Sequence, residues 1–167
     1  MNKAIVDRPP GALLRFGLHL PIWIYRLKLG WLFGKRFLML THTGRKSGMP
    51  HETIIEVVRH NRETDIYYVA SGWGERSDWF QNIRKSPKVK VRVGLKQFSA
   101  TATVVDQASE IEILRTYIQH HPIAFKELSR LFLGERLQAD ATGARRMAET
   151  MPMVAFQVEQ ETKREVL

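Results

Sequence analysis

The order of predicted elements favours an α+β fold in which a small antiparallel β-barrel carries helices on its outside. Strand-like segments follow one another through short, turn-rich connectors, one helical segment interrupts them after the third strand, and two or three helices precede a final strand. Hairpin connections of this kind join antiparallel strands, whereas a parallel sheet needs regular alternation of strands and helices. The pattern therefore predicts a barrel and not a doubly wound sheet.

Segments of alternating or β-rich composition predict about six strands. The clearest is 88–93, in which three basic residues alternate with three valines, so that one face is polar and the other apolar. Polar, turn-forming residues separate neighbouring strands, as in 60–64. The other expected strands cover 37–41, 51–59, 65–71, 97–105 and 154–158.

Capping residues and helical spacing predict the helices. Ser77 is the expected N-cap of a short helix that ends at Lys85. Ser109 and Glu112 have the spacing of a capping box, which predicts the start of a longer helix that ends near His120. The expected apolar stripe of this longer helix is Ile111, Leu114 and Ile118. The remaining helical segments are 122–133 and 141–150.

The chain length of 167 residues fits a single domain, and a hydrophobic content of 44% with 26% charged residues excludes wholesale disorder. We expect residues 1–34 to form an amphipathic N-terminal helix region. Residues 35–158 would form the barrel and its helices, and residues 159–167 a charged tail.

The N-terminal region combines bulky apolar side chains with basic ones. Charged residues interrupt its apolar stretch before it reaches the roughly 18 residues that a membrane-spanning helix needs. We expect an amphipathic helix over about 11–29 whose apolar side covers the core of a cytoplasmic protein. Because Trp23, Tyr25 and Trp31 lie close to several cations, peripheral contact with an anionic membrane surface is the alternative.

Composition narrows the chemistry. The absence of cysteine excludes disulfides, thiolate catalysis, iron–sulfur clusters and cysteine-based zinc sites. The histidines indicate no metal site, because His120 and His121 are adjacent and point apart on a helix, while His42 and His51 lack a nearby carboxylate cluster. The net charge of +9 favours an anionic ligand: a nucleic acid, a phosphate-bearing cofactor or an acidic membrane.

The first motif that bears on function is GRKSG, immediately after the first strand. Arg45 can grip a phosphate or carboxylate through two hydrogen bonds, Lys46 adds a point charge, and Ser47 adds a hydroxyl donor. Gly44 and Gly48 permit tight backbone geometry with exposed amides. The same composition is equally typical of a solvated basic hairpin turn.

The second motif is the segment 70–82, where a strand opens into a glycine-bearing loop and then a helix. Backbone amides and the helix dipole favour an anion at such a place. Trp73, Trp79 and Phe80 could flank a planar ring, and Asn82 could hydrogen-bond its polar edge. Ordinary core packing of a short helix is the alternative for Trp79 and Phe80.

The two motifs in this order, LMLTHTGRKSGMPHETIIEVV and YYVASGWGERSDWFQNIRKSPKVKVRVG, resemble the deazaflavin-dependent nitroreductase family of oxidoreductases. That family is similar in fold to the FMN-binding split β-barrels, and the resemblance extends over about 37–105. It implies a split antiparallel barrel that binds coenzyme F-420, an 8-hydroxy-5-deazaflavin with a phosphate-linked polyglutamate tail. The implied reaction is hydride transfer from the reduced cofactor to a small, lipophilic, electrophilic acceptor.

The resemblance also implies a set of cofactor-binding residues, while no catalytic residue is assigned. Those expected to hold the phosphate and acidic tail are Arg45, Lys46, Ser47 and Gly48. Those expected along the ring and ribityl chain are Thr53, Ile54, Ser71, Gly72, Trp73, Gly74, Trp79 and Asn82.

The sequence departs from that family pattern in ways that bear on the acceptor. The loop 71–79 is about two residues shorter than in well-known nitroreductase members, and Gly72 stands where they have a lysine, with Arg76 as a candidate replacement for the charge. Tyr117 is the only tyrosine after Tyr68, whereas those members carry several in their substrate pocket. A quinone or activated alkene is therefore expected at least as readily as a nitro compound.

Alternatives from the sequence are an FMN- or haem-binding split barrel and a nucleic-acid-binding barrel without catalysis. The nucleic-acid alternative rests on 81–97, a basic stretch without an acidic residue. A solvated barrel strand shows the same alternation, and no ladder of stacking aromatics accompanies it. We therefore expect a small-molecule substrate and no nucleic acid, in a protein that is either a monomer or a homodimer.

Overall fold

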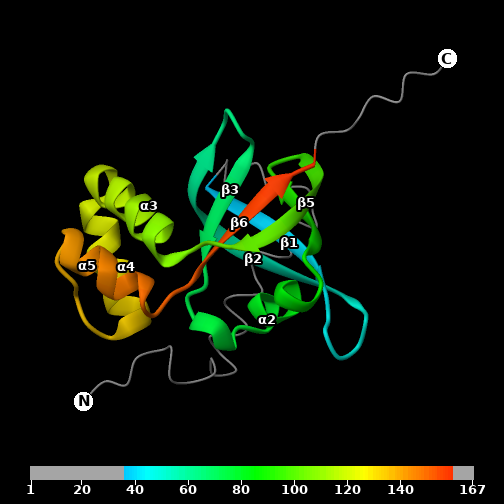
Figure 1. Cartoon of the computed structure of the whole chain (residues 1–167), viewed down its shortest axis with the longest axis horizontal. Coiled ribbons are helices and arrows are strands. Elements are labelled where there is room, and N and C mark those ends of the chain that lie inside the picture. Colours follow the sequence, from blue (N-terminus) through cyan, green and yellow to red (C-terminus); the bar gives the residue numbers. More distant parts are fainter. Residues whose placement is uncertain (1–35, 160–167) are drawn as a thin grey trace.

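Six antiparallel strands close into a barrel in the computed structural model, which describes residues 36–159. The strands are β1 (Phe37–Thr43), β2 (Pro50–Asn61), β3 (Ile66–Ala70), β4 (Lys88–Val93), β5 (Lys96–Val104) and β6 (Met153–Val158). Around the barrel their order is β1-β2-β3-β6-β5-β4, and β4 pairs back onto β1. The expected antiparallel barrel of about six strands is therefore confirmed (Figure 1).

The helices occupy the two places where the sequence predicts them. The short 3-10 helix η3 (Gly74–Arg76) and α2 (Asp78–Lys85) follow β3, while α3 (Gln107–His120), α4 (Pro122–Leu133) and α5 (Ala141–Ala148) precede β6. In Figure 1 the three later helices gather on one side of the barrel, and α2 lies below one end of it. The predicted N-terminal helix and C-terminal tail lie outside the described residues, except for Glu159 at the start of the tail. Within residues 36–159, none of the helices has the length and apolar character needed to cross a membrane.

Inward-facing side chains of the strands fill the barrel. Leu38, Leu40, Val69, Val91 and Phe156 are fully buried there. One end of this core is completed by side chains of α2, namely Trp79, Phe80 and Ile83. Burying one such side chain stabilises the fold by roughly 1.5–3 kcal/mol, so these contacts hold α2 firmly against the barrel.

A second core lies between the three later helices and the outer face of the barrel. Leu114 of α3, Phe125 of α4, Met147 of α5 and Met153 of β6 are all buried in it. Glu110 is also buried on α3, with 3% of its surface exposed. The molecule therefore has two packed layers that share the strands β3 and β6.

The predicted capping box at the start of α3 is wrong. The helix begins at Gln107, and its N-cap is Asp106, whose carboxylate accepts hydrogen bonds from the amide of Ser109 (3.0 Å) and from its hydroxyl (2.7 Å). Ser109 is therefore inside the first turn, and Glu112 forms an ion pair with Arg115 at 3.7 Å. The buried face of α3 consists of Glu110, Ile113, Leu114 and Ile118. It includes Leu114 and Ile118 of the predicted stripe, whereas Ile111 is only half-buried.

Candidate functional site

The GRKSG motif forms the tip of the hairpin between β1 and β2. The amide of Gly44 donates to the carbonyl of Met49, and the amide of Gly48 donates to the carbonyl of Gly44, both at 2.8 Å. Gly48 has a φ of 68°, a conformation that favours glycine, and nothing lies within 4 Å of a Cβ built there. The backbone at the tip is therefore open to a ligand, although the Gly48 amide itself is already used within the turn.

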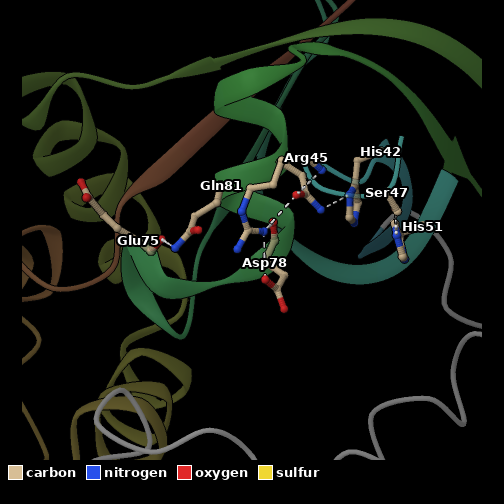
Figure 2. Close-up of polar contacts among 8 residues, drawn as sticks. His42, Arg45, Ser47, His51, Glu75, Asp78 and Gln81 are labelled. Carbon is tan, nitrogen blue, oxygen red and sulfur yellow. Dashed lines mark hydrogen bonds and ion pairs between the residues drawn. The ribbon is translucent and has the colours of Figure 1, made fainter. Parts of the chain in front are cut away.

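Arg45 fastens this turn to α2. Its Nη1 donates to Oδ1 of Asp78 at 2.9 Å and to Oδ1 of Asn82 at 3.0 Å, and its backbone amide donates to the same Asn82 oxygen at 3.0 Å. The Nζ of Lys85 donates to the Arg45 carbonyl at 2.9 Å. Figure 2 shows the guanidinium reaching from the turn to α2. The hairpin turn and α2, which are far apart in the sequence, thus fix each other's position.

Asn82 links Arg45 to the interior of the barrel. It is 4% exposed, and its Nδ2 donates to Nδ1 of His42 on β1 at 3.1 Å. Burial and the neighbouring His51 lower the pKa of His42 to about 4, against an opposing effect of Asp78. His42 is therefore a neutral imidazole near pH 7, and as a hydrogen-bond acceptor at Nδ1 it carries its proton on Nε2.

The remaining residues of the turn face solvent. Lys46 is exposed and has no ion-pair partner among residues 36–159. The hydroxyl of Ser47 lies 3.3 Å from Nε2 of His51 and accepts a hydrogen bond from the amide of Met49 at 3.2 Å. Lys46 is thus the freest cation of the motif, while Ser47 also shapes the turn.

The loop after β3 is held by a buried serine pair. Ser71 is fully buried, its hydroxyl donates to the Gly74 carbonyl at 2.7 Å, and it lies 2.7 Å from the hydroxyl of Ser77. Ser77 is at the predicted N-cap position of α2, but its hydroxyl makes no capping hydrogen bond because it is engaged with Ser71. These hydroxyls fix the loop, and the side chain of Gln81 links it to α2 by donating to the Glu75 carbonyl at 3.3 Å (Figure 2).

An aromatic contact from α4 covers the same loop. The ring of Phe132 would lie 2.4 Å from a Cβ at Gly72, so only glycine permits this approach. The same ring meets Trp73 edge-on, with 6.0 Å between centroids. The Trp73 Nε1 is buried and has no hydrogen-bond partner within the described part of the chain. Sequence reasoning missed Phe132, because nothing local marks a helical phenylalanine as a neighbour of a loop so far upstream.

The other predicted residues lie on β2 or, in the case of Trp79, on α2 where it completes the barrel core. Thr53 pairs with Leu40 and Ile54 with Met39, so consecutive side chains of β2 point to opposite faces. Thr53 therefore shares the inward face with Leu40. Trp79 is 8% exposed, belongs to the barrel core and packs edge-on against Phe80 at 5.9 Å.

The structure brings one group of predicted residues together and leaves others apart. Arg45 and Asn82 are in direct contact, and α2 connects them to the loop that holds Ser71 and Trp73. A shallow recess of about 470 Å³ lies elsewhere, between the start of α3 and the outer face of the barrel near Arg59 and Tyr68. None of the predicted cofactor residues lines that recess, so the chemistry of the α2 region is the stronger guide to the site.

The residues around α2 fit a cofactor that carries both an anionic group and a planar ring. The hairpin tip presents Lys46 and an open backbone at Gly48, which suit a phosphate. The buried indole N–H of Trp73 is a donor without an acceptor among the described residues, and a buried donor of this kind is costly unless a ligand satisfies it.

Known structures share this architecture. An F420-H2 dependent reductase aligns with a TM-score of 0.50 at 19% identity, over 74% of this chain and 96% of its own. A protein described as a domain-swapped dimer aligns with a TM-score of 0.51 at 17% identity, over 82% and 99%. A pyridoxamine 5'-phosphate oxidase-related, FMN-binding protein from Nostoc punctiforme aligns with a TM-score of 0.51 at 12% identity, over 92% and 82%. At these identities the likenesses show the fold.

Sequence comparison shows the family. No curated protein matches the chain. The model of the F420H(2)-dependent quinone reductase family matches residues 23–128, well over half of the sequence. The expected enzyme class and the expected deazaflavin cofactor are thereby confirmed. The chain belongs to the F420H(2)-dependent quinone reductase family and is an oxidoreductase that works with coenzyme F420.

Proposed function

We propose that this enzyme reduces a small lipophilic quinone, with the phosphate and acidic tail of coenzyme F420 held at the GRKSG turn. The observation that carries the proposal is the fixed basic turn, in which Arg45 is clamped to α2 while Lys46 stays unpaired among the described residues. A cation that is already oriented loses little conformational entropy when it binds an anion, which favours affinity.

In this proposal the anion is bound by charge. All hydrogen bonds that the Arg45 guanidinium makes within the described residues use Nη1, which leaves Nε and Nη2 to donate to a phosphate oxygen. Lys46 adds a second charge, and the hydroxyl of Ser47 adds a donor. Because the Gly48 amide is used within the turn, Gly48 contributes by leaving space for the ligand.

The loop 71–74 would lie beside the ring. Because Thr53 and Ile54 point to opposite faces of β2, only one of their side chains can face the ring, and Trp79 would support this region from the barrel core. When bound, the reduced deazaflavin supplies a hydride to the acceptor. Trp73 and Phe132 offer an aromatic wall to a planar acceptor, and the Trp73 N–H, which has no acceptor within residues 36–159, supports a carbonyl oxygen there. A quinone presents both a planar ring and carbonyl oxygens, whereas an alkene without a carbonyl leaves this donor unpaired.

The proton that accompanies the hydride does not come from His42 in this proposal. A pKa of about 4 leaves almost none of its imidazole protonated near pH 7, which is a poor match for a general acid. In this proposal the proton comes from water or from a hydroxyl group of the pocket near the acceptor.

The test of the anion site uses two double variants with the same loss of charge. Arg45→Ala with Lys46→Ala should weaken binding of reduced F420 by about a hundredfold or more, since charge-assisted hydrogen bonds are each worth roughly 1.5–3 kcal/mol. Lys88→Ala with Lys90→Ala, on the exposed face of β4, is the matched control and should change it little. Equal losses in both variants would mean that only the overall positive charge attracts the coenzyme.

The acceptor is tested separately, by steady-state rates with a quinone, an activated alkene and a nitro compound of similar size. The proposal expects the highest kcat/KM for the quinone. A preference for the nitro compound would overturn the quinone assignment and leave the anion site untouched.

Two further proposals concern assembly and location. We propose a homodimer in the cytoplasm, and light scattering at several concentrations tests the oligomeric state. Peripheral contact with an anionic membrane, which would bring the enzyme close to lipophilic quinones, is tested by co-sedimentation with anionic and neutral vesicles. Binding to neither kind of vesicle would remove the membrane proposal.

A further inference from the structure

One amide, that of Asn82, holds both the backbone and the guanidinium of Arg45, beside the ion pair of the guanidinium with Asp78 at 2.9 Å. The Oδ1 of Asn82 accepts both the backbone amide and the Nη1 of Arg45, each at 3.0 Å. If this amide rotated by half a turn, its NH₂ group would face two donors and both hydrogen bonds would be lost. The direction of the Asn82 amide therefore decides whether two of the hydrogen bonds that orient Arg45 form, in addition to its ion pair with Asp78.

His42 supplies the complementary partner. Its Nδ1 lies 3.1 Å from the Asn82 Nδ2, so it can accept the hydrogen bond that only the correct orientation of the amide can donate. Both side chains are nearly inaccessible, with 5% and 4% of their surfaces exposed, and water cannot easily replace either one. Asp78 on α2 and His51 on β2 are the charged or titratable groups that act on this imidazole.

We propose that His42 is a positioning residue for the anion site, which acts through Asn82 to orient Arg45 toward the phosphate of the coenzyme. The inference rests on the proposed function, because it assumes that Arg45 binds the anionic part of F420. It assigns a role to a buried residue that is not among the predicted cofactor-binding residues. The chain of contacts runs from the barrel interior to the hairpin tip, as Figure 2 shows.

The role can be separated from ordinary core packing by the choice of ligand. Coenzyme F420 carries the phosphate and the tail, whereas the phosphate-free deazaflavin with only its ribityl chain does not. A residue that merely stabilises the barrel affects the binding of both ligands, but a residue that acts through Arg45 affects only the phosphorylated one.

The experiment measures the dissociation constants of both ligands by fluorescence titration for four variants. His42→Leu removes the acceptor and keeps an apolar side chain, while His42→Asn restores an acceptor near the position of Nδ1. Arg45→Ala and the double variant of His42→Leu with Arg45→Ala complete a double-mutant cycle. Binding of the phosphate-free ligand also verifies that each variant is folded.

We expect His42→Leu to weaken F420 binding roughly three- to tenfold, the range of one net hydrogen bond, with the phosphate-free ligand unchanged. His42→Asn should recover most of the affinity, and His42→Leu should have no further effect once Arg45 is alanine. Equal losses for both ligands, additive losses in the double variant, or no loss at all would each overturn the inference. If Arg45→Ala alone leaves F420 binding unchanged, the proposed anion site fails and the inference fails with it.

Discussion

Each of the two layers of the molecule contains a buried titratable side chain, and the two side chains differ in how fully their hydrogen bonds are satisfied. At the barrel end covered by α2, His42 is neutral and its Nδ1 is satisfied by Asn82. In the helical layer, one carboxyl oxygen of Glu110 accepts a long hydrogen bond of 3.2 Å from the amide of Met153, and the other oxygen has no partner among the described residues. Burial raises the pKa of Glu110 to about 8.

This difference separates a hydrogen-bonded network at the proposed anion site from a half-satisfied carboxyl group whose ionisation costs stability. Every polar atom joining His42, Asn82 and Arg45 in the contacts above has a partner, and such networks specify one arrangement. The Glu110 carboxyl is half-satisfied, and ionising it in an apolar surrounding is expensive. We therefore expect changes at the α2 end to appear in ligand binding and in stability at acidic pH, and changes at Glu110 in stability at alkaline pH.

The largest expected effect is that of Glu110→Gln on stability at alkaline pH. The folded-state pKa is raised from 4.5 to about 8, so the folded protein holds its proton while the unfolded chain releases it, and stability falls as the pH rises from about 4.5 to 8. Removing this titration should raise the free energy of unfolding at pH 9 by up to about 5 kcal/mol relative to the wild type. Urea unfolding between pH 4.5 and 9 measures this difference.

The matched control for that variant is Glu112→Gln, two residues along the same helix and exposed to solvent. It should leave the slope of stability against pH in this window unchanged. If the curves of the wild type and Glu110→Gln run parallel, Glu110 is ionised without penalty and the contrast between the two layers disappears.

Titration of His42 should change the free energy of unfolding with pH in the direction opposite to that of Glu110. The folded-state pKa of His42 is about 4 against 6.5 when unfolded, so the unfolded state binds more protons in between and stability falls as the pH drops from 6.5 to 4. The loss amounts to about 3 kcal/mol. Because Glu110 changes stability in the opposite direction in part of this window, the measurement is best made in the Glu110→Gln background, with His42→Asn abolishing the dependence.

The control for this second measurement is His120→Asn, at an exposed position. This variant should leave the fall in the free energy of unfolding between pH 6.5 and 4 unchanged. A curve that stays flat between pH 6.5 and 4 in the Glu110→Gln background would show that His42 accepts a proton in the folded protein, contrary to its contact with Asn82.

A smaller effect is expected where the two layers meet, at Gly72. Alanine there places its Cβ 2.4 Å from the ring of Phe132, which must move away. Overpacking of this kind costs roughly 1–3 kcal/mol, and Gly72→Ala should lower the free energy of unfolding by that amount. Thermal or urea unfolding of the double variant with Phe132→Leu should recover much of the loss, and an additive loss would show that the two residues are not in contact.

The smallest effect concerns the start of α3. Asp106→Ala removes the N-cap and should lower the melting temperature by roughly 2–4 °C. Ser109→Ala should cost less, because that side chain only donates to Asp106. The reverse order, measured by thermal unfolding, would restore the capping box that the sequence alone predicts.

Elements that local physics governs follow directly from the sequence. Strand β4 has the predicted bounds because its strict alternation leaves one apolar face for the barrel, and α4 has the predicted bounds because Pro122 starts it and Gly134 ends it in a left-handed conformation. The N-cap of α3 does not follow from the sequence because two overlapping capping patterns compete there. The carboxylate of Asp106, which accepts from both the amide and the hydroxyl of Ser109, selects the earlier start.

The order of elements, the antiparallel barrel and the two segments that hold the predicted cofactor residues follow from the sequence, because they depend on side-chain periodicity, turn residues and short motifs. Which side chains meet follows from the three-dimensional packing. The contacts of His42 with Asn82, of Arg45 with Asp78 and of Gly72 with Phe132 join residues far apart in the chain. Such contacts form only when the barrel closes and α2 and α4 dock against it. No local sequence pattern encodes which distant residues these steps bring together.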